Sequence, residues 1–320
     1  MTHYGSTLQR FGWLILLALC LIFSASTCEE PIDLPFEDPL QLVVVCEFTP
    51  NKAFEVVVSE SKSILNSNTE TVYRKDALVE IELNDQSTYR LKLQDDISNS
   101  VPFYSTEMEE TPDIGEFYSL KVEVGDLPPV SASNIIPPPV VVAGEIGEIE
   151  IEQVRGEVYS YVADVIFKWE DDASIEDYYH LNIFRPITFF WVLDGDTLTN
   201  VVDPIGAEQI QESLNAEAPF QVNFNGGVLL KDETFNGQEI SLPVKLQFEL
   251  DRSEELFEFL YIELRAVSKE YYLFHSAVSK QQQDTRVTPV SEPFIVPTNI
   301  QGGLGLFAGY SINQDTLRTK

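Results

Sequence analysis

Residues 77–83 read ALVEIEL, and the alternation in this stretch decides the predicted fold class. Its glutamates fall on one face of an extended chain, whereas Val79, Ile81 and Leu83 fall on the other. Residues 88–94, TYRLKLQ, alternate in the same way. A period of two between short polar turns predicts an antiparallel β-sandwich.

Further runs rich in Val, Ile, Phe and Tyr predict strands along most of the chain. The predicted strands are 40–48, 53–60, 76–83, 88–94, 117–124, 147–154, 158–169, 178–184, 187–193, 240–249 and 259–267. Asp194-Gly195 predicts a two-residue hairpin turn after the run 187–193. The mixed segment 203–238 predicts a long excursion with helical turns near 207–214.

One helix is predicted at about 268–283, SKEYYLFHSAVSKQQQ, where apolar residues recur at i and i+4. Three consecutive prolines in NIIPPPVVV, 134–142, predict a semi-rigid joint between two domains. The fold class is therefore mostly β, with two β-sandwich domains. The first, 40–136, is expected to be Ig-like, and the second, 137–320, to carry the helix.

The N-terminus indicates export. An apolar run from Phe11 to Phe23 and the small residues before Cys28 are typical of a secretory signal peptide, 1–27. A cysteine directly after the small residues favours a bacterial lipoprotein signal, cut before an acylated Cys28. An ordinary signal peptide of a secreted protein is the alternative. Residues 28–39 are acidic and proline-rich and predict an extended tether.

The charge of the chain excludes some partners. Removal of residues 1–27 takes away Arg10 and no acid, which leaves 19 basic against 52 acidic side chains, a net charge of −33. Nucleic acid is not expected as a partner, because binding phosphates needs clustered Lys and Arg. A solvated acidic surface is the expectation, and the charge also suits basic partners or divalent cations.

The sequence contains none of the common catalytic motifs. Zinc-protease, P-loop and nucleophile-elbow patterns are absent. His180 and His275 are expected to be structural, and Cys46 to be a small buried hydrophobic residue. No enzyme activity is predicted, and a carboxylate-based hydrolase, which needs two carboxyl groups facing each other in a cleft, is the alternative.

Three stretches offer candidate binding residues. Asp194, Asp196 and Asn200 bring oxygen ligands to a turn, so calcium is a possible cofactor there, against the simpler reading of an ordinary hairpin. The acidic turn 171–177 is a second calcium candidate, against a solvated loop. Phe189, Phe190 and Trp191 cannot share one face of a strand, so one face can pack inward while the other meets a ligand or partner.

The C-terminal stretch SEPFIVPTNIQGGLGLFAGYS, 291–311, resembles the ending of domain-of-unknown-function family 4249. Earlier in the chain, weaker similarities to the same family lie in order at CEEPIDL, at LVVVCEFTPNKAFEVVVSES and at FKWEDDASIEDYYHLNIF. Independently of the family, the glycines of GGLGLFAG predict a strand that packs closely under other elements.

The resemblance implies an outer-membrane lipoprotein of the Bacteroidota type, displayed on the cell surface or on the periplasmic face. It also implies a TonB-dependent outer-membrane transporter as a neighbour, and it supplies no established catalytic residues to carry over. The expected function is therefore a non-enzymatic binding or accessory module for nutrient uptake, held in the membrane by acylated Cys28. A structural or adhesive surface lipoprotein without a transporter is the alternative.

Overall fold

The computed structural model describes residues 40–62, 70–84, 87–95, 101–107, 110–125, 127–193, 196–202, 204, 206–208, 210–211, 221–222, 225–284 and 295–318. The predicted signal peptide, the tether and Cys28 lie outside these residues. The described part is mostly β with a single α-helix, which confirms the predicted fold class.

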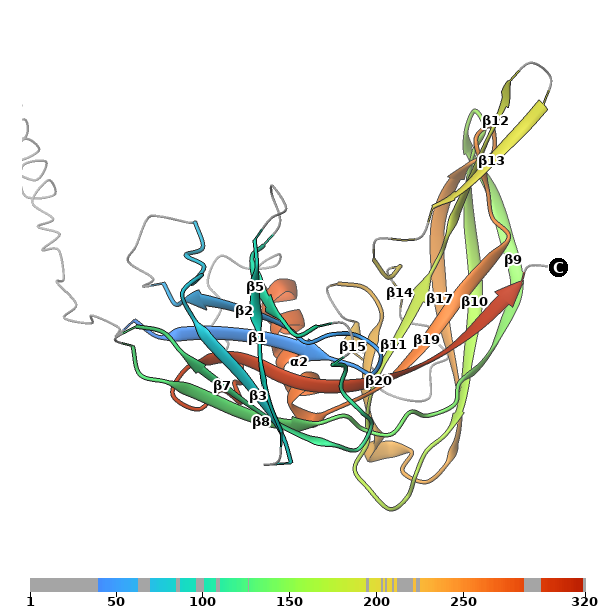
Figure 1. Cartoon of the computed structure of the whole chain (residues 1–320). Coiled ribbons are helices and arrows are strands. Elements are labelled where there is room, and N and C mark those ends of the chain that lie inside the picture. The colour runs from blue at the N-terminus through green and yellow to red at the C-terminus, as the bar shows by residue number, and fades with distance from the viewer. Residues whose placement is uncertain are drawn as a thin grey trace, which may run out of the picture. The chain divides into compact units, whose positions relative to one another are not determined.

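The largest described sheet, which we call the long sheet, has nine strands and runs through the whole described fold (Figure 1). Its strands, in spatial order, are β15 (Gln221–Val222), β16 (Val228–Lys231), β11 (Tyr178–Phe184), β19 (Phe259–Val267), β20 (Leu304–Arg318), β1 (Leu42–Phe48), β2 (Glu55–Glu60), β6 (Phe103–Ser105) and β5 (Lys92–Gln94).

Three smaller sheets complete the β structure. The first contains β4 (Ser87–Arg90), β3 (Leu78–Leu83), β7 (Phe117–Glu123) and β8 (Val130–Ile135). The second contains β14 (Ile210–Gln211), β17 (Glu239–Asp251), β10 (Val158–Glu170) and β9 (Ala143–Arg155). The third contains β13 (Asp196–Val202), β12 (Ile187–Leu193) and β18 (Glu255–Leu256). The helices are the 3-10 turn η1 (Asp232–Thr234) and α2 (Lys269–Asp284).

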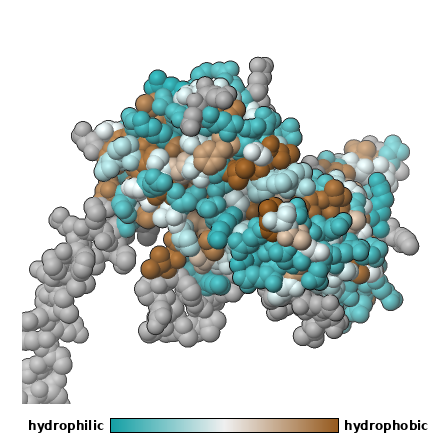
Figure 2. All heavy atoms as spheres, turned by 90° about the horizontal axis from the view of Figure 1, so that it is seen from below, coloured by the Kyte–Doolittle hydropathy of each residue, from teal (hydrophilic) through white to brown (hydrophobic). Residues whose placement is uncertain are grey.

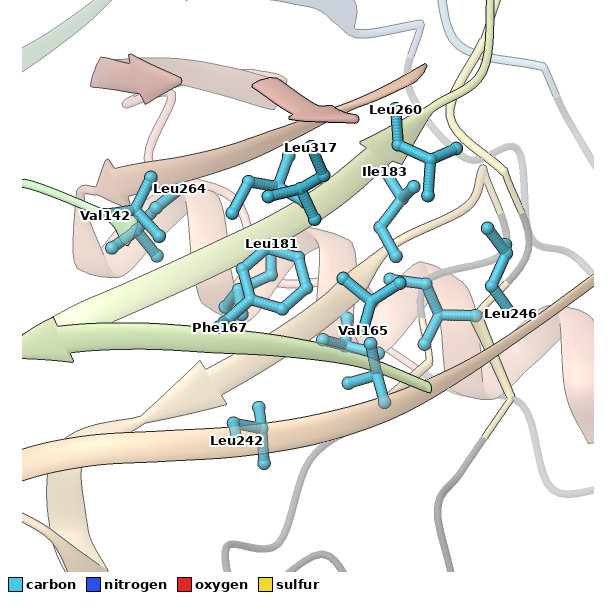
Figure 3. Close-up of a cluster of buried hydrophobic side chains, with 14 of the residues drawn as sticks. Val142, Val165, Phe167, Leu181, Ile183, Leu242, Leu246, Leu260, Leu264 and Leu317 are labelled. Carbon is cyan, nitrogen blue, oxygen red and sulfur yellow. The ribbon is translucent and has the colours of Figure 1, made fainter. Parts of the chain in front are cut away.

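Two sandwich cores lie against the long sheet. The first core joins β1 and β2 to β3, β7 and β8, and the alternation noted in 77–83 places Val79 and Ile81 in it, both fully buried. The second core joins β11 and β19 to β10 and β17. Figure 3 shows side chains from these strands, such as Phe167, Leu181 and Leu242, pointing toward one another.

Strand β20 belongs to both cores. Its first part pairs in parallel with β1, from Val43 opposite Leu304 to Phe48 opposite Gly309. Its second part pairs antiparallel with β19, and Phe307 and Leu317 enter the first and the second core, respectively. The parallel pair departs from the expected antiparallel sandwich, because the chain returns to the first core only after completing the second.

The glycines of β20 allow the close packing that the sequence predicts. Gly305 has a φ of +117°, and a Cβ there would collide with the carbonyl group of Val44 on β1. A Cβ added at Gly309 would likewise collide with the carbonyl oxygen of Ile135. Both positions therefore have no room for a side chain.

Helix α2 confirms the predicted helix within one residue at each end. It packs on the face of the long sheet opposite the two cores, where Tyr271 meets Val267, Leu306, Ala308 and Tyr310. The Ser268 Oγ accepts a hydrogen bond from the backbone N–H of Tyr271 at 3.4 Å, so Ser268 is placed as the expected cap.

Some local predictions were wrong. The stretch 88–94 is two strands, β4 and β5, because the chain changes sheets at Leu91, whose side chain is buried. Residues 210–211 form the strand β14 rather than a helix, with buried Ile210 paired to Leu246. Strands β6, β8, β15, β16 and β18 were not predicted. The division into domains at 136 stays a prediction.

Candidate functional site

The hairpin of β12 and β13 is the most exposed pair of strands in the fold. The two strands pair from Ile187 opposite Val202 to Leu193 opposite Asp196, so the hairpin predicted from Asp194-Gly195 is confirmed on both sides of its turn. All described residues of β13 are exposed. Figure 1 shows the hairpin extending past the ends of β10 and β17.

The register gives the hairpin an apolar face. Because side chains alternate along a strand, Trp191 and Leu198 stand directly opposite each other, and Leu193 is the next residue of β12 on the same face. Val202 lies on this face too, beyond Asn200. Trp191 is 47% exposed and Leu198 is 40% exposed. We call these four residues the hairpin stripe. A stripe of this kind, left uncovered by its own chain, marks an interaction surface.

The predicted ligand surface divides between the two faces of this hairpin. Phe189 lies on the face of the stripe and Phe190 on the other face, both half-buried, whereas Trp191 is exposed. The sequence therefore named the strand and its exposed aromatic residue, but it missed the partners on β13. The signal for these partners was present in the alternation of TLTNVV, where Leu198 and Val202 share a face.

The predicted calcium ligands are only partly described. Asp194 lies outside the described residues. Asp196 and Asn200 lie four residues apart on one extended strand, roughly 13 Å, with Leu198 between them on the same face. Among the described residues, no group of three His, Cys, Asp or Glu side chains is arranged to hold a metal ion. Calcium binding at this turn stays a prediction.

The second acidic turn, 171–177, is tied into the fold by hydrogen bonds. Buried Asp171 accepts a hydrogen bond from the Tyr179 hydroxyl at 2.5 Å and another from the backbone N–H of Gly237 at 2.7 Å. Buried Asp232 accepts one from the backbone N–H of Asp177 at 2.8 Å. Burial, with a smaller effect of the nearby carboxylates, raises the pKa of Asp177 to about 6.

This raised pKa gives a test by pH. A free aspartate has a pKa of about 3.9, so between about pH 4 and pH 6 the folded protein binds the Asp177 proton more tightly than the unfolded chain does. The contribution of Asp177 to stability therefore falls as the pH rises through this window. We expect Asp177→Asn to be more stable than the wild type at about pH 8 and the difference to narrow toward about pH 4. Urea unfolding of both proteins across this pH range measures the difference in their free energies of unfolding. A difference that does not change with pH would contradict the raised pKa of Asp177.

A buried polar network lies beside α2, on the face of β11, β19 and β20 opposite the second core. Its center is Glu263, which accepts hydrogen bonds from Arg265 Nε at 2.6 Å, Gln314 Nε2 at 2.7 Å and Asn182 Nδ2 at 3.4 Å. The Tyr271 hydroxyl accepts a hydrogen bond from Arg265 Nη1 at 3.4 Å. The register of the three strands sets these positions, since Asn182, Glu263 and Gln314 are direct cross-strand neighbours.

Both histidines have hydrogen-bond partners within the fold, which agrees with the structural role predicted for them. His180 Nε2 donates to the carbonyl of Gly226 at 3.4 Å, so its Nδ1 accepts from the Tyr271 hydroxyl at 2.9 Å. Burial lowers the pKa of His180 well below its usual value, which keeps the ring neutral. His275 Nε2 donates to Glu47 at 2.9 Å. Cys46 is buried in the first core, and burial raises the pKa of its thiol, so the prediction of an inert thiol agrees with its surroundings.

An open pocket of about 680 Å³ adjoins the polar network. It lies at the end of β1, where the chain stops pairing with β20. The turn Thr49–Lys52 forms part of its wall. Glu263, Arg265 and Gln314 reach it from β19 and β20. These residues were not predicted from the sequence, although Glu263 and Arg265 stand on one face of an otherwise apolar strand, YIELRAV.

Comparison with known protein families shows which family this chain belongs to. The model of the family described as domain of unknown function (DUF4249) matches residues 29–316. The chain belongs to the DUF4249 family. A comparison with curated proteins finds no match.

Three of the segments that suggested DUF4249 form central strands of the described fold, whereas CEEPIDL lies outside the described residues. LVVVCEF is β1, YYHLNIF is β11, and the glycine-rich ending forms the start of β20. These three strands hold the long sheet together, so the signature of this DUF4249 protein marks its framework rather than the hairpin stripe. In the described residues, no helix has both the length and the apolar character needed to cross a membrane.

Proposed function

We propose that this DUF4249 protein is an outer-membrane lipoprotein that acts as a non-enzymatic accessory module of a TonB-dependent transporter in nutrient uptake. Acylated Cys28 would hold it in the membrane of its partner and raise the local concentration of both proteins. The observation that carries the proposal is the hairpin stripe, an apolar surface on a projecting pair of strands that no described part of the chain covers.

The chemistry of the hairpin favours a protein partner in the membrane. The face drawn in Figure 2, seen from below, is mostly hydrophilic with separate apolar patches, which agrees with the excess of acidic residues. The described hairpin contains no basic residue, so attraction to anionic lipid headgroups is not what would seat it. Its apolar side chains and the outer edge of β13, which pairs with no other described strand, instead suit a protein surface that offers apolar side chains and strand edges.

Extraction of the tagged protein from its native outer membrane in mild detergent tests the proposal, with mass spectrometry to identify what accompanies it. We expect a stoichiometric TonB-dependent transporter with the wild-type protein. In the matched variant Cys28→Ala, we expect release from the membrane and loss of the transporter, because the anchor and its effect on concentration are gone. A membrane-bound protein that brings no partner would overturn the proposal and favour a structural or adhesive role.

A further inference from the structure

The pocket beside the polar network has the size and the walls of a small-molecule site. Its volume of about 680 Å³ lies within the range of roughly 300–1,000 Å³ that ligand pockets occupy. Phe184, Tyr261 and Ile312 give it apolar walls from three adjacent strands of the long sheet, β11, β19 and β20. A rigid sheet therefore positions these walls, as precise binding requires.

The charge of the pocket is opposite to the charge of the chain. Its lining contains two basic residues, Lys52 and Arg265, and one acidic residue, Glu263. The whole chain contains 52 acidic and 20 basic residues. At physiological ionic strength the screening length is roughly 8 Å, so a ligand in the pocket responds mainly to these nearby charges.

The single acid is not available to a ligand. Glu263 is 3% exposed, and each of its carboxylate oxygens accepts at least one hydrogen bond, from Arg265, Asn182 or Gln314. Its charge balances that of Arg265, with which it forms an ion pair at 2.6 Å. Glu263 therefore orients Arg265, and Lys52 leaves the pocket with one positive charge in excess.

Arg265 keeps donor capacity on one side of its guanidinium group. Its Nε donates to Glu263 and its Nη1 to Tyr271, and the group lies 5.0 Å from the ring center of Tyr310. Its Nη2 has no hydrogen-bond partner among the described residues. Lys52 is exposed on the turn after β1 and forms no ion pair with a described residue. Two cationic donors with unused capacity thus line a partly apolar pocket.

We propose that this pocket binds a small carboxylate that carries an apolar body. The carboxylate would accept hydrogen bonds from Arg265 and Lys52, since charge-assisted bonds to a carboxylate are the strongest that these side chains make. The apolar body would lie against Phe184, Tyr261 and Ile312. This site shares no residue with the hairpin stripe, so the proposal goes beyond transporter docking and does not depend on it.

Isothermal titration calorimetry on the full-length protein in nonionic detergent tests the site. The probes are phenylacetate, indole-3-acetate and isovalerate, each beside its neutral amide, with acetate and inorganic phosphate as further arms. We expect saturable binding of at least one carboxylate with an apolar body. Its affinity should exceed that of its amide by at least about tenfold, because the amide lacks the charge. Acetate and phosphate should bind at least about tenfold more weakly, since neither has an apolar body.

Two variants assign the binding to the pocket. Arg265→Lys keeps the charge beside Glu263 but loses the planar fork, and we expect a roughly tenfold loss of affinity. Lys52→Gln, on an exposed turn, should weaken binding about three- to tenfold without a change in stability. Lys280→Gln is the matched control, because Lys280 is also exposed but does not line the pocket.

Several results would overturn the proposal. They are the absence of saturable binding by every carboxylate, equal binding of an acid and its amide, and equal binding of phosphate. If neither Lys52→Gln nor Arg265→Lys changed the affinity for the carboxylate, the proposal would also be overturned. Thermal unfolding of each variant shows whether the fold is intact, and Lys52→Gln decides the result if Arg265→Lys is unstable.

Discussion

Gly305→Ala should unfold this protein or lower its free energy of unfolding by at least about 3 kcal/mol. Gly305 has a φ of +117°, a region that is essentially restricted to glycine, and a Cβ there would meet the carbonyl group of Val44. Relief of that collision would require β20 to move away from β1, which breaks the parallel pairing of these strands. Both cores would be affected, because β20 contributes to each of them.

Gly156→Ala is the control for this effect. Gly156 also has a positive φ, +52°, but it lies in the turn between β9 and β10, with nothing within 4 Å of an added Cβ. We expect a loss of only about 1 kcal/mol, from the backbone conformation alone. Urea unfolding of both variants measures the difference. If Gly305→Ala were no more destabilising than Gly156→Ala, the close contact between β20 and β1 would be wrong.

Replacement of the hairpin stripe should abolish recovery of the partner. In Trp191→Ser/Leu198→Ser, two directly opposed apolar side chains are lost from one face of the hairpin. Buried tryptophans at interfaces commonly contribute 2 kcal/mol or more, so we expect the partner's affinity to fall by at least roughly 30-fold. The free energy of unfolding should stay within about 0.5 kcal/mol, because both side chains are already exposed.

The matched control removes apolar side chains that are at least as exposed, elsewhere on the surface. Val141→Ser/Val154→Ser changes residues that are 74% and 50% exposed and lie outside the hairpin. We expect normal recovery of the transporter with this control, quantified by mass spectrometry against the wild type. Equal loss in both variants would indicate a general effect of surface polarity and count against the hairpin stripe.

Local patterns carried most of the secondary structure. The alternation in ALVEIEL places Val79 and Ile81 in the first core, and Asp194-Gly195 predicts the hairpin that the register of β12 and β13 confirms. The i, i+4 pattern likewise predicts α2. In each case the signal lies within about one element length, where the period of the backbone alone decides which side chains share a face.

Long-range pairing could not be predicted in this way. The parallel pairing of β1 with β20 joins Val43 to Leu304, and nothing in either strand specifies the other. The polar network shows the same limit. Alternation places Glu263 and Arg265 on one face of β19, but Asn182 and Gln314 reach them only because β11 and β20 are its neighbours. The pocket therefore became visible only in three dimensions.

Site-specific photo-crosslinking in living cells tests most directly whether the hairpin stripe contacts a transporter. A photoreactive residue placed at Leu198, on the stripe, should crosslink to a TonB-dependent outer-membrane transporter that mass spectrometry identifies. The same residue at Val154, on β9, should give no such product. A stripe that gives no transporter adduct, or no more than the position on β9 gives, would contradict the proposed accessory role.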